Sequence, residues 1–248
     1  MKRSNIINSI KKEIIGLFDI PNGTCPICGR VLFSLDHFIC GNCEKDLKFH
    51  DSKTCAACGR MVLEASATYC RDCLTFGVVF DGGYCHFRYG EDEKQIIWAM
   101  KFGNRRALCQ WAGKAMLQGL LQTEWMTGCD VIVPVPISEG HLKIRGYNQS
   151  EKIAEGLAEA LLDMGIVMPV AVNAIRRCKE GKDQIGSTRE ERISQLQGAF
   201  CMDDAKEIRG KKVLLIDDVI TTGATLRECA EVLRQGGAES IYTAVCAG

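Results

Sequence analysis

Val213-Leu-Leu-Ile-Asp-Asp-Val-Ile-Thr-Thr-Gly-Ala-Thr225 is the stretch that decides the fold of this 248-residue chain. Its apolar start, Val213–Ile216, predicts a buried central strand, and Asp217 and Asp218 follow where open α/β sheets bind their ligands. The small residues of Thr221–Thr225 predict a turn into a helix, whose backbone N–H groups can surround a phosphate. Two adjacent carboxylates can accept hydrogen bonds from vicinal ribose hydroxyls, directly or through Mg²⁺. The segment therefore predicts a site for a phosphorylated ribose.

Periodic apolar residues on either side of this segment predict strands that alternate with helices. Strands are expected at 79–89, 130–136, 170–175, 212–217 and 240–246, and helices at 91–102, 105–122, 148–164 and 223–235. Such alternation implies an α/β fold with a mostly parallel sheet and helices on both faces. Residues 176–199 are polar and basic, and they predict a long loop with one short helix. A mobile lid over the ribose site is the functional alternative for this loop.

Eight of the fifteen cysteines lie in four Cys-x-x-Cys pairs in the first third of the chain. The segment Thr24–Arg30 recurs thirty residues later as Thr54–Arg60, so two copies of one motif stand in tandem. Each Cys-x-x-Cys turn offers two thiolates to a metal, and two turns complete a closed tetrahedral site that suits structural zinc. The sequence predicts two zinc ions, held by Cys25, Cys28, Cys40, Cys43, Cys55, Cys58, Cys70 and Cys73.

The spacing leaves the pairing of these cysteines open. All three intervals between successive pairs contain eleven residues, so sequential sites and a cross-braced arrangement are both compatible, although the repeat favours sequential ribbons. Gly29 and Gly59 fit the tight turn after each first pair. The other seven cysteines are expected to be small core residues or free thiols; they are Cys85, Cys109, Cys129, Cys178, Cys201, Cys229 and Cys246.

Composition limits the compartment and the partners. The chain has no visible secretory signal and no apolar run long enough to span a bilayer, so we expect a cytoplasmic protein without stable membrane insertion. In that reducing compartment, paired cysteines favour metal over disulfides. The net charge is zero, so a nucleic-acid partner must rely on local basic patches. Residues 1–20 predict an amphipathic helix that packs on the zinc region or a partner subunit, with a membrane-surface helix as the alternative.

Two basic clusters can contact phosphates or nucleic acid. One joins Lys101 to Arg105 and Arg106, and the other runs through Arg145–Gln149, where cations, an aromatic ring and two amides precede a helix. A structural turn capped by Asn148 is the equal alternative for the second cluster. The candidate phosphate or nucleic-acid contacts are Lys101, Arg105, Lys143, Arg145, Tyr147, Asn148 and Arg192.

The segment Val213–Thr225 resembles the PRPP-binding motif of type I phosphoribosyltransferases nearly position for position. The resemblance implies that the acids Asp217 and Asp218 hold the ribose and are the catalytic pair of an active enzyme. It also implies a phosphoribosyltransferase fold and a 5′-phosphate bound by the loop of Thr221, Thr222, Gly223, Ala224 and Thr225.

A second loop resembles the pyrophosphate loop of the glutamine amidophosphoribosyltransferases. It spans Val133–Ser138, and its candidate contacts are Val135 and Pro136. Those enzymes continue with Asp-Ser-Gly, whereas Ile137-Ser138-Glu139 stands here. An acidic Glu139 repels a pyrophosphate unless Mg²⁺ intervenes, so the departure weakens the expectation of turnover and leaves the expected fold unchanged.

Further stretches resemble one family, the ComF proteins, which join an N-terminal zinc module to a phosphoribosyltransferase domain. The match covers about residues 24–248 and includes the cysteine pairs and PRPP segment together with Phe87–Tyr89, Lys101–Gly103, Val133–Pro136, Arg145–Gln149, Arg176, Arg177, Gln184, Arg192 and Gly198–Phe200. One departure is Gln195, where Asn is expected. The chain is thus expected to comprise the helix at 1–20, a double zinc ribbon at 21–76 and a phosphoribosyltransferase-type domain at 77–248.

ComF proteins are implicated in natural competence, the uptake and handling of transforming single-stranded DNA. The resemblance implies a protein of DNA uptake that binds PRPP, or a nucleotide 5′-phosphate, with Mg²⁺. Its expected partners are single-stranded DNA and competence or DNA-processing proteins. Two alternatives stay open: an active phosphoribosyltransferase with an unknown acceptor, and a PRPP-sensing regulator without turnover.

Overall fold

The structure, a computed structural model, describes residues 23–33, 37–49, 53–64, 66–179 and 196–248. The chain divides into two compact units, Met1–Leu47 and Lys48–Gly248. This division falls between the two cysteine repeats, inside the expected ribbon domain, so the second repeat packs with the α/β domain. The expected helix at 1–20 lies outside the described residues, as do Gln184, Arg192 and Gln195.

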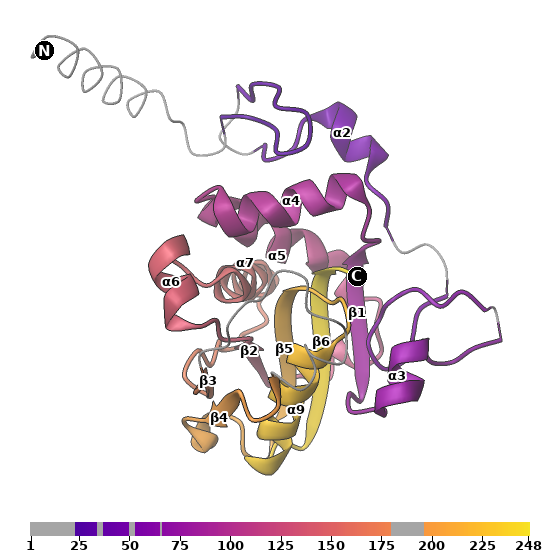
Figure 1. Cartoon of the computed structure of the whole chain (residues 1–248), viewed down its shortest axis with the longest axis vertical. Coiled ribbons are helices and arrows are strands. Elements are labelled where there is room, and N and C mark those ends of the chain that lie inside the picture. Colours follow the sequence, from indigo (N-terminus) through magenta and orange to yellow (C-terminus); the bar gives the residue numbers. More distant parts are fainter. Residues whose placement is uncertain (1–22, 34–36, 50–52, 65, 180–195) are drawn as a thin grey trace, which may run out of the picture. The chain divides into compact units, whose positions relative to one another are not determined.

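A four-stranded parallel sheet forms the centre of the larger unit (Figure 1). Its strands lie side by side in the order β1 (Gly82–Phe87), β6 (Ser240–Ala247), β5 (Lys212–Val219) and β2 (Val131–Pro134). Val133 of β2 lies opposite Leu215 of β5. Central parallel strands are covered on both faces and need continuous apolar runs, and Val213–Ile216 is fully buried. The predicted α/β fold is confirmed.

Helices cover both faces of this sheet (Figure 1). Successive side chains of a strand point to opposite faces, and Val213 and Leu215 share a core with α9 (Ala224–Gln235). On the other face, α5 (Arg106–Leu120) packs against α7 (Gln149–Asp163).

The contact between α5 and α7 is close because each helix presents a glycine to the other. A Cβ at Gly113 of α5 would lie 2.0 Å from the carbonyl oxygen of Ile153, and one at Gly156 of α7 would lie 2.0 Å from that of Gln110. Only hydrogen fits at these two positions, and the tight packing fixes where the first turn of α7 meets the sheet edge.

Several shorter elements complete the domain. Helix α4 (Glu91–Phe102) ends at the predicted break, where Asn104 has a φ of +49°. The predicted strand at 170–175 is wrong: Val170 forms a single bridge to Ile132, and the chain turns at Asn173 before a separate antiparallel pair begins. The additional elements are η1 (Met126–Gly128), α6 (Glu139–Arg145), β3 (Ile175–Arg177), β4 (Phe200–Met202) and η2 (Ala205–Glu207).

Both cysteine repeats fold into the same kind of turn. In the first ribbon (residues 24–47), Gly29 has a φ of +72°, and in the second ribbon (residues 54–77), Gly59 has a φ of +74°. Each of these N–H groups donates to the carbonyl of the first cysteine of its repeat at 2.9 Å. A short helix then starts at each second cysteine pair: α2 (Gly41–Asp46) in the first ribbon and α3 (Arg71–Phe76) in the second.

Two of the scattered cysteines correct the sequence analysis. Cys178 and Cys201 form a disulfide, so the expectation of core or free thiols is wrong for this pair. The cause is the β3–β4 hairpin, in which Arg176 lies opposite Cys201 and the Cys178 N–H donates to the carbonyl of Ala199, so the two sulfurs meet across the strands. The other five are buried free thiols, as predicted. Among the described residues, no helix has the length and apolar character needed to cross a membrane.

Candidate functional site

The two acids of the central segment lie near the carboxyl end of β5. Asp218 is 5% exposed, and Lys101 Nζ, from the end of α4, lies 3.0 Å from its Oδ1. Burial, and then the charge of Asp218, raise the pKa of Asp217 to about 7. Burial opposes the charged form of Lys101, but the charges of Asp218 and Asp217 outweigh it and raise the Lys101 pKa. The two carboxyl groups thus concentrate negative charge at the end of β5, and Lys101 is the cation that pairs with them.

The loop after β5 forms a small hollow at the start of α9. Residues 219–226 line a cavity of about 30 Å³ together with Asp217. Gly223 is the N-cap of α9 with a φ of +76°, a left-handed conformation that glycine adopts without strain. The Ala224 N–H points toward Thr222 Oγ1 at 3.4 Å. This loop (residues 221–225, the phosphate loop) combines backbone donors with a helix N-terminus, the arrangement that binds anions.

The N-terminus of α7 braces the acid pair. Ser150 Oγ donates to Asp217 Oδ1 at 2.9 Å. Asn148 is the N-cap of α7: its Oδ1 accepts from the Ser150 N–H at 3.1 Å, and its Nδ2 donates to the carbonyl of Val135 at 3.0 Å. These hydrogen bonds connect the loop after β2, which contains Val135 and Pro136, to the carboxyl end of β5 through the first turn of α7. Asn148 is 9% exposed and holds the two loops together rather than facing solvent.

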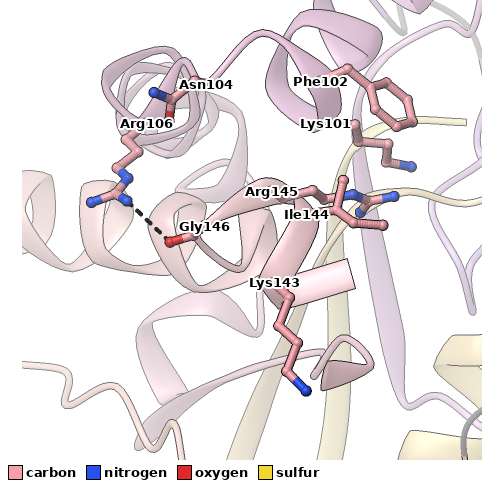
Figure 2. A pocket seen from close by; sticks show the side chains of 8 residues that line it. All are labelled: Lys101, Phe102, Asn104, Arg106, Lys143, Ile144, Arg145 and Gly146. Carbon is pink, nitrogen blue, oxygen red and sulfur yellow. Dashed lines mark hydrogen bonds between the residues drawn. The ribbon is translucent and has the colours of Figure 1, made fainter. Parts of the chain in front are cut away.

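A basic cavity of about 430 Å³ has Lys101, the ion-pair partner of Asp218, in its lining. Figure 2 shows the side chains that line it. It is lined by Lys101, Phe102, Asn104, Arg106, Lys143, Ile144, Arg145 and Gly146. Arg145 stands 5.3 Å from the centre of the Phe102 ring, and its Nη1 donates to Gln149 Oε1 at 3.0 Å. Arg145 Nε and Gln149 Nε2 are buried donors with no hydrogen-bond partner in the described part of the chain, which suits an anionic ligand.

The remaining predicted contacts lie in different surroundings. Tyr147 is buried, and its hydroxyl donates to the carbonyl of Met100 at 2.5 Å, so its ring packs in the core instead of stacking on a base. Lys143 is exposed and lies 3.8 Å from Glu139. Arg105 precedes α5 as its N-cap, and Arg106 rather than Arg105 lines the basic cavity.

Other residues of this region were not predicted from the sequence. The Ser150 contact depends on where the first turn of α7 meets β5, and the pairing of Lys101 with Asp218 joins positions more than a hundred residues apart. Phe102 carries a detectable signal, since it is an exposed aromatic ring beside a lysine. Ile144 was missed because an aliphatic side chain carries no chemical signal for a phosphate or base contact.

The sulfur atoms of the ribbons fit zinc. The candidate ligands gather as two sequential tetrads, and within each tetrad all four sulfurs lie within 4.8 Å of one another: Cys25, Cys28, Cys40 and Cys43 in the first ribbon, and Cys55, Cys58, Cys70 and Cys73 in the second. The distance from Cys28 Sγ to Cys40 Sγ is 3.6 Å, and that from Cys58 Sγ to Cys70 Sγ is also 3.6 Å. A tetrahedral site with Zn–S bonds of about 2.3 Å requires sulfurs about 3.8 Å apart. The open pairing is thus sequential, and both sites are closed and structural.

Family comparisons agree with this architecture. The family model for a phosphoribosyl transferase domain matches residues 148–248. The model for a double zinc ribbon domain matches residues 20–74. The two matches cover the acid pair with its phosphate loop and the two cysteine tetrads, respectively.

Three named relatives align along most of the chain. Competence protein F of Haemophilus influenzae is 29% identical over 224 residues, which cover 89% of this chain and 88% of that protein. DNA utilization protein YhgH of Escherichia coli is 26% identical over 225 residues, covering 88% and 94%. Competence protein ComFC of Streptococcus pneumoniae is 24% identical over 237 residues, covering 88% and 97%. With both domains matched and the similarity running along nearly the whole of each relative, the chain belongs to the ComF family.

Proposed function

We propose that this protein takes part in the uptake or use of DNA and binds PRPP, or another phosphoribosyl 5′-phosphate, with Mg²⁺ at the carboxyl end of β5. The names of the relatives, competence protein and DNA utilization protein, support the cellular role. One observation supports this choice of ligand: Asp217 and Asp218 lie at the end of β5 that leads directly into the phosphate loop at the N-terminus of α9.

Each part of the site has a separate task in this proposal. Asp217 and Asp218 accept hydrogen bonds from the two ribose hydroxyls, and Mg²⁺, when bound, screens the charge between these acids and the pyrophosphate. The backbone N–H groups and hydroxyls of residues 221–225 hold the 5′-phosphate. Val135 and Pro136 directly follow β2, the neighbour of β5, and in this proposal their loop contacts the pyrophosphate of PRPP.

Isothermal titration of the zinc-loaded protein with PRPP tests this ligand. Binding is expected in Mg²⁺ and is expected to weaken at least tenfold in Asp218→Ala, because each charge-assisted hydrogen bond contributes about 1.5–3 kcal/mol. Wild-type protein that binds neither PRPP nor ribose 5-phosphate in Mg²⁺ would contradict the proposal.

The basic cavity supports single-stranded DNA as a second ligand. Lys143 and Arg145 supply positive charge beside the exposed ring of Phe102, a combination that contacts both the backbone and the bases of a single strand. A titration with an oligonucleotide across salt concentrations is expected to give weaker binding at higher salt, since phosphate contacts release counterions. If neither the salt concentration nor the double change Lys143→Ala with Arg145→Ala alters the affinity for the oligonucleotide, this cavity is not the binding site for single-stranded DNA.

An active phosphoribosyltransferase is the second candidate function. It is favoured by one observation: the loop after β2 and the acid pair after β5 meet at the same sheet edge, where a transferase brings pyrophosphate and ribose together. The assay measures pyrophosphate release from PRPP with a panel of bases and amines. Release is expected to stop in Asp218→Ala, and no release with any acceptor would favour a binding or PRPP-sensing role.

For the compartment we infer the cytoplasm. Eight cysteines must stay reduced to hold two metals, and a reducing compartment keeps them so. The single Cys178–Cys201 disulfide points the other way, but it is outnumbered by the eight thiols of the two tetrads. This setting also suits contact with competence or DNA-processing proteins after DNA has entered the cell.

A further inference from the structure

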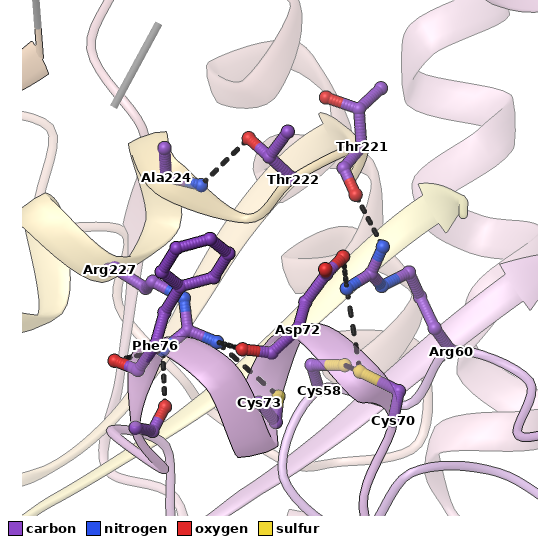
Figure 3. A network of polar contacts seen from close by, with 11 residues as sticks. Cys58, Arg60, Cys70, Asp72, Cys73, Phe76, Thr221, Thr222, Ala224 and Arg227 are labelled. Atoms are coloured by element: carbon purple, nitrogen blue, oxygen red, sulfur yellow. Dashed lines mark hydrogen bonds and ion pairs between the residues drawn. The ribbon is translucent and has the colours of Figure 1, made fainter. Parts of the chain in front are cut away.

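The second ribbon reaches the phosphate loop through two arginine side chains (Figure 3). Arg60 follows the first cysteine pair of this ribbon, and Arg227 lies in the first turns of α9, just after the loop. Each guanidinium contacts one metal-ligating sulfur of the ribbon. Both arginines lie outside the set of residues that the proposed function assigns to the ligand.

Arg60 connects a zinc ligand to the first residue of the phosphate loop. Its Nη2 lies 3.4 Å from Cys70 Sγ and 2.7 Å from Asp72 Oδ2. Its Nη1 donates to the carbonyl oxygen of Thr221. The Arg60 side chain is 16% exposed and that of Asp72 is 11% exposed, so the group is largely removed from water. Because the guanidinium is planar and its donors have a fixed geometry, the contacts to Cys70 and Asp72 constrain where the Thr221 carbonyl can lie.

Arg227 ties the start of α9 to the helix of the second ribbon. Its Nη2 lies 3.5 Å from Cys73 Sγ and 3.3 Å from the carbonyl oxygen of Asp72. Its Nη1 lies 3.2 Å from the carbonyl oxygen of Phe76 and donates also to that of Gly77. The Phe76 and Gly77 carbonyls lie at the C-terminal end of α3, which attracts a cation. The helix that begins at the phosphate loop is thus anchored on the ribbon.

The charge of a metal site strengthens both contacts. Four thiolates around one Zn²⁺ leave an excess of two negative charges, and a hydrogen bond to an ionised acceptor is about twice as strong as one to a neutral acceptor. A neutral thiol is a weak acceptor, so loss of zinc weakens the hold of each guanidinium on its sulfur. The state of the second metal site is therefore coupled to the loop by two direct contacts.

We propose that the second zinc site positions the phosphate loop, and that Arg60 and Arg227 are the positioning residues that connect them. While Cys70 and Cys73 are zinc-bound thiolates, the two arginines hold residues 221–225 and the start of α9 in the geometry that binds a phosphate. This role rests on the proposed function of the loop as the 5′-phosphate site. Binding of the phosphoribosyl ligand then depends on zinc in the second ribbon.

The first ribbon provides a matched control. Arg30 occupies the position of Arg60 in the repeat, and Asn42 occupies that of Asp72. Arg30 is exposed, whereas Arg60 is largely buried. Changing each arginine to alanine removes the same side chain from the same kind of turn.

Hydrogen–deuterium exchange on the full zinc-loaded chain tests the positioning role without any ligand. Arg60→Ala is expected to speed exchange of the amides of residues 219–226 by about tenfold, because a fixed contact of the loop is lost. Arg30→Ala is expected to leave these amides unchanged. Both variants are expected to keep two zinc ions per chain and wild-type exchange in α5, which reports on the global stability of the domain.

Ligand binding gives a second, specific readout. With ribose 5-phosphate in Mg²⁺, Arg60→Ala is expected to raise the Kd about tenfold, which equals about 1.4 kcal/mol, and Arg30→Ala to leave it unchanged. Pyrophosphate, which does not use the loop, is expected to bind all three proteins equally. If the wild type binds neither ribose 5-phosphate nor PRPP, the proposed function fails, while the exchange measurement still decides the positioning role.

Two results would overturn the proposal. One is wild-type exchange at 219–226 in Arg60→Ala with both zinc ions retained. The other result concerns a second variant, which is needed if Arg60→Ala loses its second zinc. Arg60→Lys keeps the positive charge but lacks the planar set of donors, and it is expected to retain zinc while the amides of the loop exchange faster. Wild-type exchange in a zinc-loaded Arg60→Lys would contradict a role for the fork.

Discussion

The two cysteine ribbons share one turn but differ in their surroundings. Gly29 and Gly59 have φ values of +72° and +74°. A Cβ at Gly59 would lie 2.6 Å from the backbone of Tyr84, whereas one at Gly29 meets no described atom of its own unit within 4 Å. In the second ribbon, Cys55, Cys58 and Cys73 join the core that includes β5 and α9. A repeated sequence thus gives a repeated fold, and the neighbours decide what each copy does.

The difference shows how a small metal module can become part of another domain. The first ribbon belongs to its own compact unit, 1–47, and the second belongs to the unit that carries the acid pair. We therefore expect loss of the first zinc to affect mainly its own ribbon. Loss of the second should reach the sheet and the phosphate loop.

Removing the metal ligands should give the largest effect. Cys55→Ser with Cys58→Ser is expected to lower the Tm of the α/β domain by about 20 °C or more, since structural zinc supplies about 10 kcal/mol or more to a small metal-folded module. Cys25→Ser with Cys28→Ser is expected to leave that Tm within about 2 °C. Differential scanning calorimetry measures both. Equal losses in the two double variants would contradict the difference between the ribbons.

The two turn glycines give the next largest effect. Gly29→Ala is expected to destabilise its ribbon by about 1 kcal/mol, because a left-handed conformation disfavours a Cβ. Gly59→Ala adds a clash with the backbone of Tyr84, which brings a further penalty of about 1–3 kcal/mol. Urea unfolding followed by a probe in the α/β domain should detect the second change only. A similar midpoint for both variants would mean that the second ribbon moves freely on β1.

The pH dependence of binding separates the acid pair from the ribbon contact. Burial and Asp218 raise the pKa of Asp217 to about 7, so this carboxyl carries a proton at pH 6 and loses it when Mg²⁺ or ribose hydroxyls bind. Affinity for PRPP is expected to rise up to about tenfold per pH unit below 7 and to level off above it. Arg60→Ala should keep this slope at lower affinity, because a guanidinium does not titrate in this range.

Asp217→Asn is the control for this profile. Its amide oxygen can still accept from Ser150 Oγ, but it has no proton to lose, so the part of the slope due to Asp217 should vanish. The effect of pH on folding stability through Asp217 is opposite in direction to its effect on PRPP affinity. The folded protein holds the Asp217 proton more tightly than the unfolded chain does, so this group lowers stability as pH rises from about 4 through 7. Without ligand, Asp217→Asn should therefore be more stable than wild type at pH 8, and a lower Tm would contradict the raised pKa.

The smallest effect is expected from the acid that holds Arg60. Asp72→Asn keeps one acceptor but removes the charge opposite Arg60, which should destabilise the domain by about 1–2 kcal/mol. Asn42→Asp in the first ribbon makes the reverse change and is expected to alter stability by less than about 0.5 kcal/mol. Thermal unfolding of the two variants compares them directly. A larger change in Asn42→Asp would show that the ribbons depend on their acids equally.

Local patterns carried most of what could be predicted from the sequence. Apolar runs gave the buried strands around Val213–Ile216, and the glycine–asparagine break gave the end of α4, because both depend on residues close in sequence. The strand at 170–175 failed since its apolar residues pack without a continuing partner. The disulfide failed because Cys178 and Cys201 meet only through the β3–β4 hairpin.

In the candidate site, too, the residues within one contiguous motif could be predicted, and the contacts between distant segments could not. Asp217, Asp218 and the phosphate loop form one contiguous motif and could be read directly. Lys101 was predicted as a contact for phosphate or nucleic acid, but its 3.0 Å contact with Asp218 depends on how α4 packs. Arg60 and Arg227 were not among the predicted site residues, since nothing nearby in sequence indicates that they connect a zinc site to the loop.

A crystal structure of the zinc-loaded chain with Mg²⁺ and PRPP tests the central claim most directly. The predicted result has the ribose hydroxyls on Asp217 and Asp218, the 5′-phosphate in the loop of residues 221–225, and Arg60 still donating to the carbonyl of Thr221. PRPP bound elsewhere, with its 5′-phosphate in the basic cavity and the loop empty, would contradict it.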